Sequence, residues 1–396
     1  MCGIAGYIGT SKNPETSYKI MTKVFEELES RGRDAAGFWG TSEDQKVVYQ
    51  KQPIRSSQMV HQADWRKLKE FKPNMLLAHA RGASQGTPQI NKNNHPFTTT
   101  DYRVGMVHNG KVPQGQYECL TKKYQVVSEC DSEVILRIFE SGEDYTKEEI
   151  DESFPNIDRS IACRLSGLKD IWSYIDGSMA VAIGEMLDAG HRRVWFFRNA
   201  YRPLWFADMR EELGQIFFVS TPDIWYRSVY KLNIKNIFNQ KIKLIELPEN
   251  EIWMMDISPA HPVVTDENVQ KFEIETSDSN LTWDEQQENE KNGIKERRMT
   301  VEVVTSLNNK DEMDHSKSSR QGQEVNYEEE NTIAACQENF EMMMQNMRQL
   351  LSNIDMAVSN QVREGSMSGR DFEELICSLE QTEGDLMGTL SILEGK

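Results

Sequence analysis

Cys2 is the residue in this chain whose type and position first suggest chemistry. It directly follows Met1 and precedes a short glycine-rich apolar run. Removal of Met1 would leave a thiol and a free α-amine on one residue. That amine, with a reference pKa of about 7.7 to 8.0, can serve as a general base. A lone cysteine is more often a small buried hydrophobe, but position 2 favours a nucleophile that carries its own base.

A thiolate that attacks an amide carbon creates an oxyanion, which needs hydrogen-bond donors already aimed at it. The segment MVHNG, residues 106–110, offers two such donors. Here a β-like run ends in Asn109, which has a side-chain amide, and Gly110, whose backbone N–H can be approached closely. The alternative is a hairpin turn, and for an isolated Asn-Gly pair that is the better interpretation.

An amino acid substrate carries an α-carboxylate and an α-ammonium group, which a guanidinium and a carboxylate can recognise. Arg81 is a candidate for the first role because it closes an apolar run and opens a Gly/Ser-rich loop. Asp131 is a candidate for the second, at the start of a helical pattern. The alternatives are a surface ion pair for Arg81 and a helix cap or first-turn acid for Asp131.

The elements that must position these residues are short β-like runs joined by brief turns, which favours antiparallel pairing. They occupy the chain up to residue 257, from GIAGYIG and MLLAHAR to SMAVAIGEML, RRVWFFRN, QIFFVST and EIWMMDI. Apolar residues recur at helical spacing in 15–30, 131–140 and 158–174. This pattern predicts an α+β sandwich, not a doubly wound parallel sheet.

Composition changes after residue 257. Residues 258–331 are rich in Asp, Glu, Asn, Gln, Ser and Lys, so we expect an acidic flexible linker. Periodic apolar residues return in 332–396, and a GSMSG segment at 365–369 divides them into two runs. We expect an amphipathic helical hairpin or coiled coil that self-associates or docks onto a partner.

Charge and cysteine content exclude several classes of protein. The net charge of −18, from 63 acidic and 45 basic residues, argues against nucleic-acid binding. No apolar run has membrane-spanning length and no secretory signal is present, so we expect a cytoplasmic protein without a membrane partner. The six cysteines lack metal-binding spacing. His79, His95 and His108 are interpreted as structural, and we predict neither metal nor cofactor.

The order of the motifs is more specific than any one of them. MCGIAGYIG, RGRDAAG, AHARGASQG, NNHPF, HNG, ECDSEVI, DGSMAVAI and FFRNAYRPLWF follow one another along the chain. Over residues 2–257 this series resembles the glutaminase domain of the class II glutamine amidotransferases, which have an amino-terminal cysteine. The resemblance implies the four-layer αββα fold of amino-terminal-nucleophile hydrolases.

The same resemblance implies roles for the candidate residues. Cys2 would be both nucleophile and base, and Asn109 and Gly110 would form the oxyanion hole. Arg81 and Asp131 would hold the charged end of glutamine.

Two departures from the family pattern stand out. Gly82 stands where relatives usually carry a bulky aromatic, which affects the wall or lid of the glutamine pocket. Residues 258–396 lack the phosphate or nucleotide loops of an ammonia-using domain. The RGRDAAG segment is interpreted as a turn near Cys2, which Arg33 and Asp34 would help to order.

We therefore expect hydrolysis of glutamine to glutamate and ammonia through a thioester on Cys2, with the ammonia passed to a separate acceptor protein. One alternative is a stand-alone hydrolase of another γ-glutamyl amide. The other is a catalytically retired fold that serves as a binding module.

Overall fold

The computed structural model describes residues 2–199, 201–232 and 244–273. The expected tail at 332–396 and most of the expected linker at 258–331 lie outside these ranges. Within them, no helix is both long enough and apolar enough to cross a membrane.

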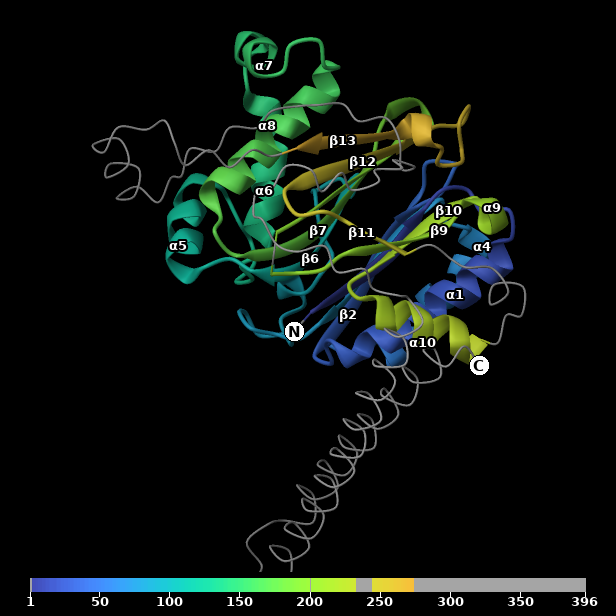
Figure 1. Ribbon diagram of the computed structural model, residues 1–396. Helices are drawn as coiled ribbons and strands as arrows, with labels where there is room; N and C mark the ends of the chain where they lie inside the picture. Colours follow the sequence, from blue (N-terminus) through green and yellow to red (C-terminus); the bar gives the residue numbers. More distant parts are fainter. Residues whose placement is uncertain (1, 200, 233–243, 274–396) are drawn as a thin grey trace, which may run out of the picture. The chain divides into compact units, whose positions relative to one another are not determined.

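Two antiparallel sheets form the centre of the described domain (Figure 1). The first has seven strands, in the order β11, β9, β10, β1, β4, β2, β3: Leu244–Glu246, Trp205–Met209, Gln215–Val219, Gly3–Ile8, Met75–Arg81, Ala35–Thr41 and Val47–Gln52. The second has six strands, in the order β13, β12, β8, β7, β6, β5: Val269–Glu273, Glu251–Ile257, Arg192–Arg198, Ser178–Met186, Val104–Lys111 and Phe97–Thr98.

Helices cover the outer face of each sheet. Against the first sheet pack α1, α2, α3, α4, α9 and α10: Pro14–Glu27, Ser56–Met59, Ala63–Arg66, Leu68–Phe71, Arg210–Leu213 and Pro222–Leu232. Against the second pack α5, α6, α7 and α8: Gln114–Lys123, Glu133–Ser141, Lys147–Ser153 and Arg159–Tyr174. Within the described ranges, five short 3₁₀ turns, η1 to η5, lie at Leu28–Ser30, Asn91–Asn93, Gly142–Asp144, Asp188–Gly190 and Asp266–Asn268.

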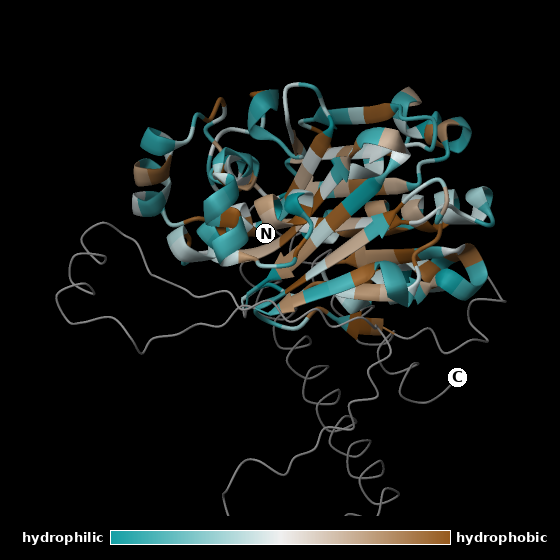
Figure 2. Ribbon diagram, turned by 90° about the horizontal axis from the view of Figure 1, so that it is seen from above, coloured by the Kyte–Doolittle hydropathy of each residue, from teal (hydrophilic) through white to brown (hydrophobic). Residues whose placement is uncertain are grey.

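Strand alternation explains the layers. In β1, Ile4 and Ile8 pack between the sheets while Ala5 and Tyr7 face the helices. Both faces of the strands are therefore buried, and apolar colour runs through the sheets in Figure 2. The described domain has the layer order helix, sheet, sheet, helix, which confirms the predicted α+β class with antiparallel sheets.

The two sheets can pack closely because small residues surround one large side chain between them. The indole of Trp39 lies there, and a Cβ on Gly105 or Gly184 would approach it to 2.3 or 2.6 Å. The Trp39 Nε1–H donates to the carbonyl of Tyr102 over 2.9 Å. Glycine at these two positions therefore lets the second sheet pack closely over β2.

The helices expected at 15–30, 131–140 and 158–174 are confirmed as α1 with η1, α6 and α8. Two residues stabilise the start of α1: Pro14 occupies its first turn, and the Asn13 side chain accepts a hydrogen bond from the Thr16 N–H. The RGRDAAG segment is only partly a turn, because Ala35 onward forms the inner strand β2.

The domain extends past the boundary expected at residue 257. Residues 269–273 form β13, which pairs antiparallel with β12, and its Val269 and Phe272 are buried. The expected boundary falls too early because these two apolar residues stand in a segment of acidic and polar composition. Their neighbours Gln270 and Lys271 are only partly buried.

Phe272→Ala tests this extension. Removing a buried phenylalanine side chain should lower the free energy of unfolding by about 3–5 kcal/mol. Gln270→Ala on the same strand should change it by less than about 0.5 kcal/mol. Chemical denaturation of the full chain measures both. Equal, small effects would show that β13 does not belong to the folded core.

Candidate active site

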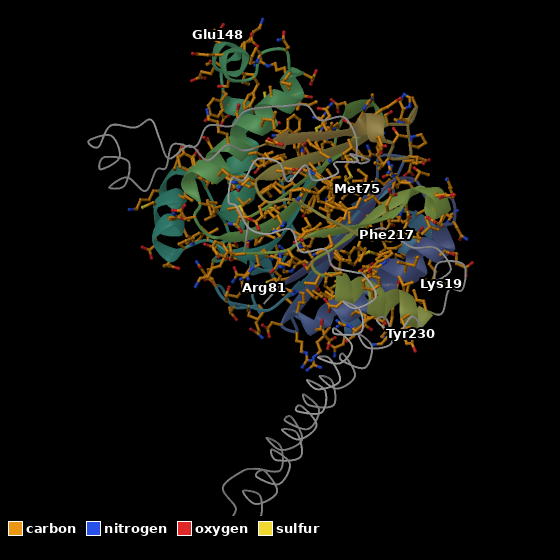
Figure 3. The ribbon with its side chains drawn as sticks, in the orientation of Figure 1. Lys19, Met75, Arg81, Glu148, Phe217 and Tyr230 are labelled. Carbon is orange, nitrogen blue, oxygen red and sulfur yellow. The ribbon has the colours of Figure 1, made fainter. Side chains whose placement is uncertain are left out.

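Cys2 lies where β1 begins, beside the end of β4. The antiparallel register pairs Gly3 with Ala80, so the next position outward brings Cys2 alongside Arg81. The Cys2 Sγ lies 3.6 Å from the carbonyl oxygen of Gly82, to which the thiol donates. In Figure 3, Arg81 and Met75 mark the two ends of β4, and the site is at the Arg81 end.

Hydrogen bonds fix the backbone around Cys2. The Arg31 Nε–H donates to the Cys2 carbonyl over 3.0 Å. Ser220 makes two hydrogen bonds to Ile4. The Ser220 Oγ accepts from the Ile4 N–H at 2.8 Å, and the Ser220 N–H donates to the Ile4 carbonyl at 2.9 Å. Gly32 allows the chain to pass close to β4, because a Cβ there would lie 2.3 Å from the Arg81 carbonyl carbon.

Arg33 and Asp34 are both expected to order the segment near Cys2, but only Asp34 makes such a contact. Asp34 does order this neighbourhood, because its Oδ2 accepts from the Ala83 N–H over 2.7 Å. Arg33 is exposed, and Arg31 makes the contact with Cys2. The sequence signal for Arg31 was present in the same RGRD segment, but two arginines there could not be ranked without the turn geometry.

Asn109 and Gly110 lie inside a strand. They belong to β6 and pair with Ala180 and Met179 of β7, so the hairpin-turn alternative is wrong. The Asn109 side chain is only 1% exposed, and its Nδ2 has no hydrogen-bond partner among the described residues. Gly110 must lack a side chain, because a Cβ would lie 1.9 Å from the Ser178 carbonyl oxygen. A buried, unsatisfied amide is costly, and substrate binding would compensate for that cost.

Arg81 is a buried guanidinium surrounded by neutral oxygens. It is 2% exposed and donates to Asn94 Oδ1 at 2.8 Å and to the carbonyls of Gln85 and Gly86. None of the ion pairs in the described part of the chain includes it, so the surface ion-pair alternative is wrong. These contacts order the loop at 85–94, but they leave a buried positive charge without a carboxylate.

Asp131 is a buried residue of the opposite charge. It is 2% exposed; its Oδ2 accepts from the Val112 N–H at 2.8 Å, and its Oδ1 lies 3.7 Å from the Cys130 Sγ. It caps no helix, because α6 starts at Glu133 after Ser132 and Asp131 precedes both. Within the described ranges this buried carboxylate likewise has no cation within ion-pair distance.

The pKa of the Cys2 thiol depends on both Arg81 and Asp131. Burial raises the pKa of Cys2, and the Asp131 carboxylate raises it further. A backbone hydrogen bond at Gly82 and the positive charge of Arg81 act in the opposite direction. Both charged side chains are therefore close enough to influence Cys2. The structure brings the Cys2 thiol, a buried cation and a buried anion to one end of the sheets.

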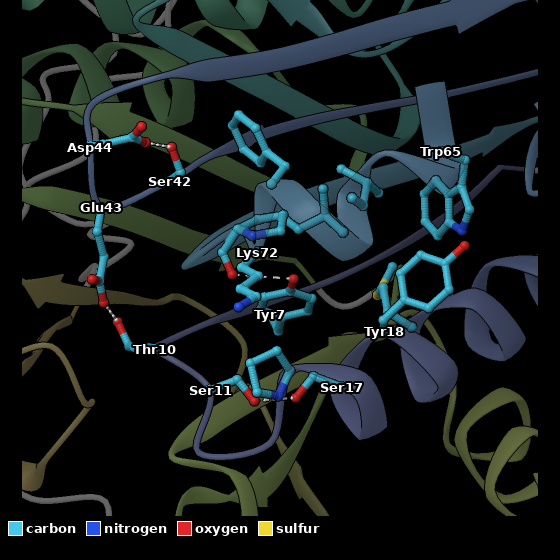
Figure 4. Close-up of a pocket in the computed structure, with 16 residues that line it drawn as sticks. Tyr7, Thr10, Ser11, Ser17, Tyr18, Ser42, Glu43, Asp44, Trp65 and Lys72 are labelled. Carbon is cyan, nitrogen blue, oxygen red and sulfur yellow. Dashed lines mark hydrogen bonds between the residues drawn. The ribbon is translucent and has the colours of Figure 1, made fainter. Parts of the chain in front are cut away.

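A separate pocket of about 440 Å³ lies at the other end of β1. Its lining includes Tyr7 of β1, Thr10 before α1, Trp65 of α3 and Lys72 after α4 (Figure 4). Cys2 precedes β1, whereas Tyr7 lies near the far end of that strand and Thr10 lies beyond it. This pocket is therefore distinct from the Cys2 site. No group of three or more His, Cys, Asp or Glu residues in the described ranges is placed to hold a metal ion.

Comparisons with known proteins give relatives for part of the chain, although no family model matches it. Over 144 residues it is 34% identical to a glutamine–fructose-6-phosphate aminotransferase (isomerizing) of Staphylococcus aureus, covering 35% of this chain and 22% of that protein. Over 160 residues it is 34% identical to the protein of the same name from Bacillus thuringiensis subsp. konkukian, covering 39% and 24%. The matches thus span less than a quarter of the length of these relatives.

Among solved structures, the chain is similar to glutamine phosphoribosylpyrophosphate amidotransferase from B. subtilis in complex with ADP and GMP. The TM-score is 0.45 at 16% identity, and the similarity covers 69% of this chain and 49% of that one.

The charge arrangement around Cys2 makes a prediction that does not depend on turnover. Asp131→Asn should lower the pKa of Cys2, because it removes a negative charge that disfavours the thiolate, and Arg81→Gln should raise it. The pH dependence of Cys2 alkylation by iodoacetamide, followed by mass spectrometry, measures both. Glu148→Gln, an exposed position on α7 far from Arg81 (Figure 3), is the control. An unchanged Cys2 profile in both site variants would contradict the arrangement.

Proposed function

We propose that this chain, part of which is related to the class II glutamine amidotransferases, hydrolyses the side-chain amide of glutamine to glutamate and ammonia. On this proposal Cys2 is the nucleophile, and Asn109 and Gly110 supply the oxyanion hole. Arg81 and Asp131 bind the two charges of the amino acid. The αββα domain is then of the amino-terminal-nucleophile hydrolase type.

The observation that carries the proposal is a pair of buried charges that have hydrogen bonds but no oppositely charged partner among the described residues. Arg81 and Asp131 are each about 2% exposed, and neither forms an ion pair with a described residue. Isolated buried charges are strongly destabilising unless something compensates for them. A bound amino acid would do so at both positions, because its α-carboxylate pairs with a guanidinium and its α-ammonium with a carboxylate.

The reaction follows from these placements. The α-amine of Cys2 takes the thiol proton, and the sulfur attacks the amide carbon while Asn109 Nδ2–H and Gly110 N–H donate to the oxyanion. The C–N bond then breaks, and ammonia leaves with the proton held by the amine. Water adds to the resulting thioester, its proton passing to the amine, and glutamate departs as the thiol is restored.

The ammonia acceptor is the least defined part of the proposal. The relatives are named as aminotransferases that act on fructose 6-phosphate, but this chain matches less than a quarter of their length. We propose that ammonia passes to a separate acceptor protein. The domain would comprise residues 2–273, followed by a linker and a helical tail at 332–396 that docks or dimerises.

Two other functions use the same fold. A hydrolase of another γ-glutamyl amide would keep all five site residues, and Gly82, with no side chain beside Cys2, favours it where the substrate carries a larger amide substituent. A catalytically retired binding module would not need an unpartnered Asn109 amide. Release of glutamate and ammonia from free glutamine by the purified, Met1-trimmed protein distinguishes the proposed function from both alternatives.

Cys2 should be indispensable in two ways. Cys2→Ser should abolish turnover, and protein that retains Met1 should be inactive because the proposed base is then tied up in a peptide bond. Activity should fall as the pH drops through the pKa of the amine, since protonation removes the base. Intact-mass analysis coupled to the glutaminase assay checks this. Full activity from protein that quantitatively retains Met1 would contradict the mechanism.

Asn109→Ala should lower kcat by about 10²- to 10³-fold, the usual cost of deleting one oxyanion donor. Arg81→Ala should act mainly by raising KM for glutamine, because its charge contacts the part of the substrate that does not react. Steady-state kinetics distinguish the two effects. A wild-type kcat in Asn109→Ala would mean that the buried amide has no catalytic role.

A further inference from the structure

His79 connects the two sheets directly behind the candidate oxyanion hole. It lies on β4 of the first sheet, and its Nε2 is 3.0 Å from the carbonyl oxygen of His108 on β6 of the second. Both side chains are buried. A carbonyl can only accept, so the Nε2 atom of His79 carries the proton and donates it.

The carbonyl that His79 holds belongs to the peptide group between His108 and Asn109. On one side, β6 pairs with β7 along its length. On the other side its ladder with β5 covers only Gly105 and Met106, so His108 lies beyond that ladder. Because a peptide group is planar, fixing this carbonyl also fixes the N–H and Cα of Asn109, from which the unpartnered amide projects.

A second histidine holds His79 in place. The His95 ring stacks on His79 with centroids 3.9 Å apart and planes 15° from parallel. His95 follows Asn94, whose Oδ1 accepts from Arg81. The same loop therefore contacts the guanidinium with one residue and the His79 ring with the next.

Both rings are neutral. Burial lowers the pKa of His79 to about 3 and that of His95 well below its ordinary value. A neutral imidazole has a single N–H, and His79 uses it on the His108 carbonyl. The His79 Nδ1 has no partner among the described residues, so the hydrogen bond to His108 is the contact that fixes the ring's tautomer.

We propose that His79 is a positioning residue for the reaction: its Nε2–H holds the His108–Asn109 peptide group so that the Asn109 amide stays aimed at the oxyanion. This inference rests on the proposed glutaminase function and adds a role that acts through Asn109 without contact with glutamine. A histidine that merely fills space between the sheets would need no donor at this atom.

Two substitutions of similar chemistry separate positioning from packing. In His79→Gln the amide nitrogen can reach about as far as the imidazole Nε2, whereas in His79→Asn it is one bond shorter. His79→Asn should lower kcat by about 10- to 100-fold, less than deletion of the donor itself, with KM for glutamine within about twofold of wild type. His79→Gln should recover most of the loss. Thermal unfolding and intact mass show that each full-length variant is folded and trimmed.

A double-mutant cycle tests whether the effect passes through Asn109. In an Asn109→Ala background, His79→Asn should lower kcat by less than about twofold, because the amide that it positions is already absent. An independent structural effect would lower kcat by the same factor in both backgrounds.

The outcomes divide cleanly. Inactive wild-type protein overturns the proposed function and this inference together. With an active wild type, equal losses in His79→Gln and His79→Asn, a loss that appears in KM, or full additivity with Asn109→Ala overturns the inference alone.

Discussion

The register between β1 and β4 is the constraint on which the site depends. Gly3 opposite Ala80 places Cys2 beside Arg81, and a shift by one residue would exchange every side chain between the two faces of β1. Burial on both faces resists such a shift, because Ile4 and Ile8 belong between the sheets and Ala5 and Tyr7 under the helices. Ser220 and Arg31 then tie down the backbone at the strand end.

The second sheet completes the site because small residues allow it to approach. Gly105 and Gly184 make room for Trp39, and Gly110 lets β6 pass close to Ser178. Near the Cys2 thiol the protein keeps a buried guanidinium and a buried carboxylate that form no ion pair with a described residue, and a buried amide whose nitrogen has no hydrogen-bond partner among the described residues. Such groups lower stability unless a ligand satisfies them, so their concentration near one thiol is more informative than any one of them.

Much of this could be predicted from residue patterns, and the failures have physical causes. Helical spacing identified α1, α6 and α8, while β13 was missed because two apolar side chains, Val269 and Phe272, suffice to anchor a strand in an acidic segment. Asn109 and Gly110 looked like a turn in isolation, and only pairing with β7 places them in a strand. The contact of His79 with His108 joins different sheets, so no local pattern encodes it.

Labelling with a diazoketone analogue of glutamine tests the central claim most directly, because the reagent must be recognised as glutamine before it alkylates the nucleophile. The account predicts one label per chain, on Cys2, with protection by free glutamine and loss of labelling in Asp131→Asn. Labelling of the exposed Cys119 in place of Cys2, or labelling of Cys2 that glutamine does not prevent, would contradict a glutamine site at this thiol.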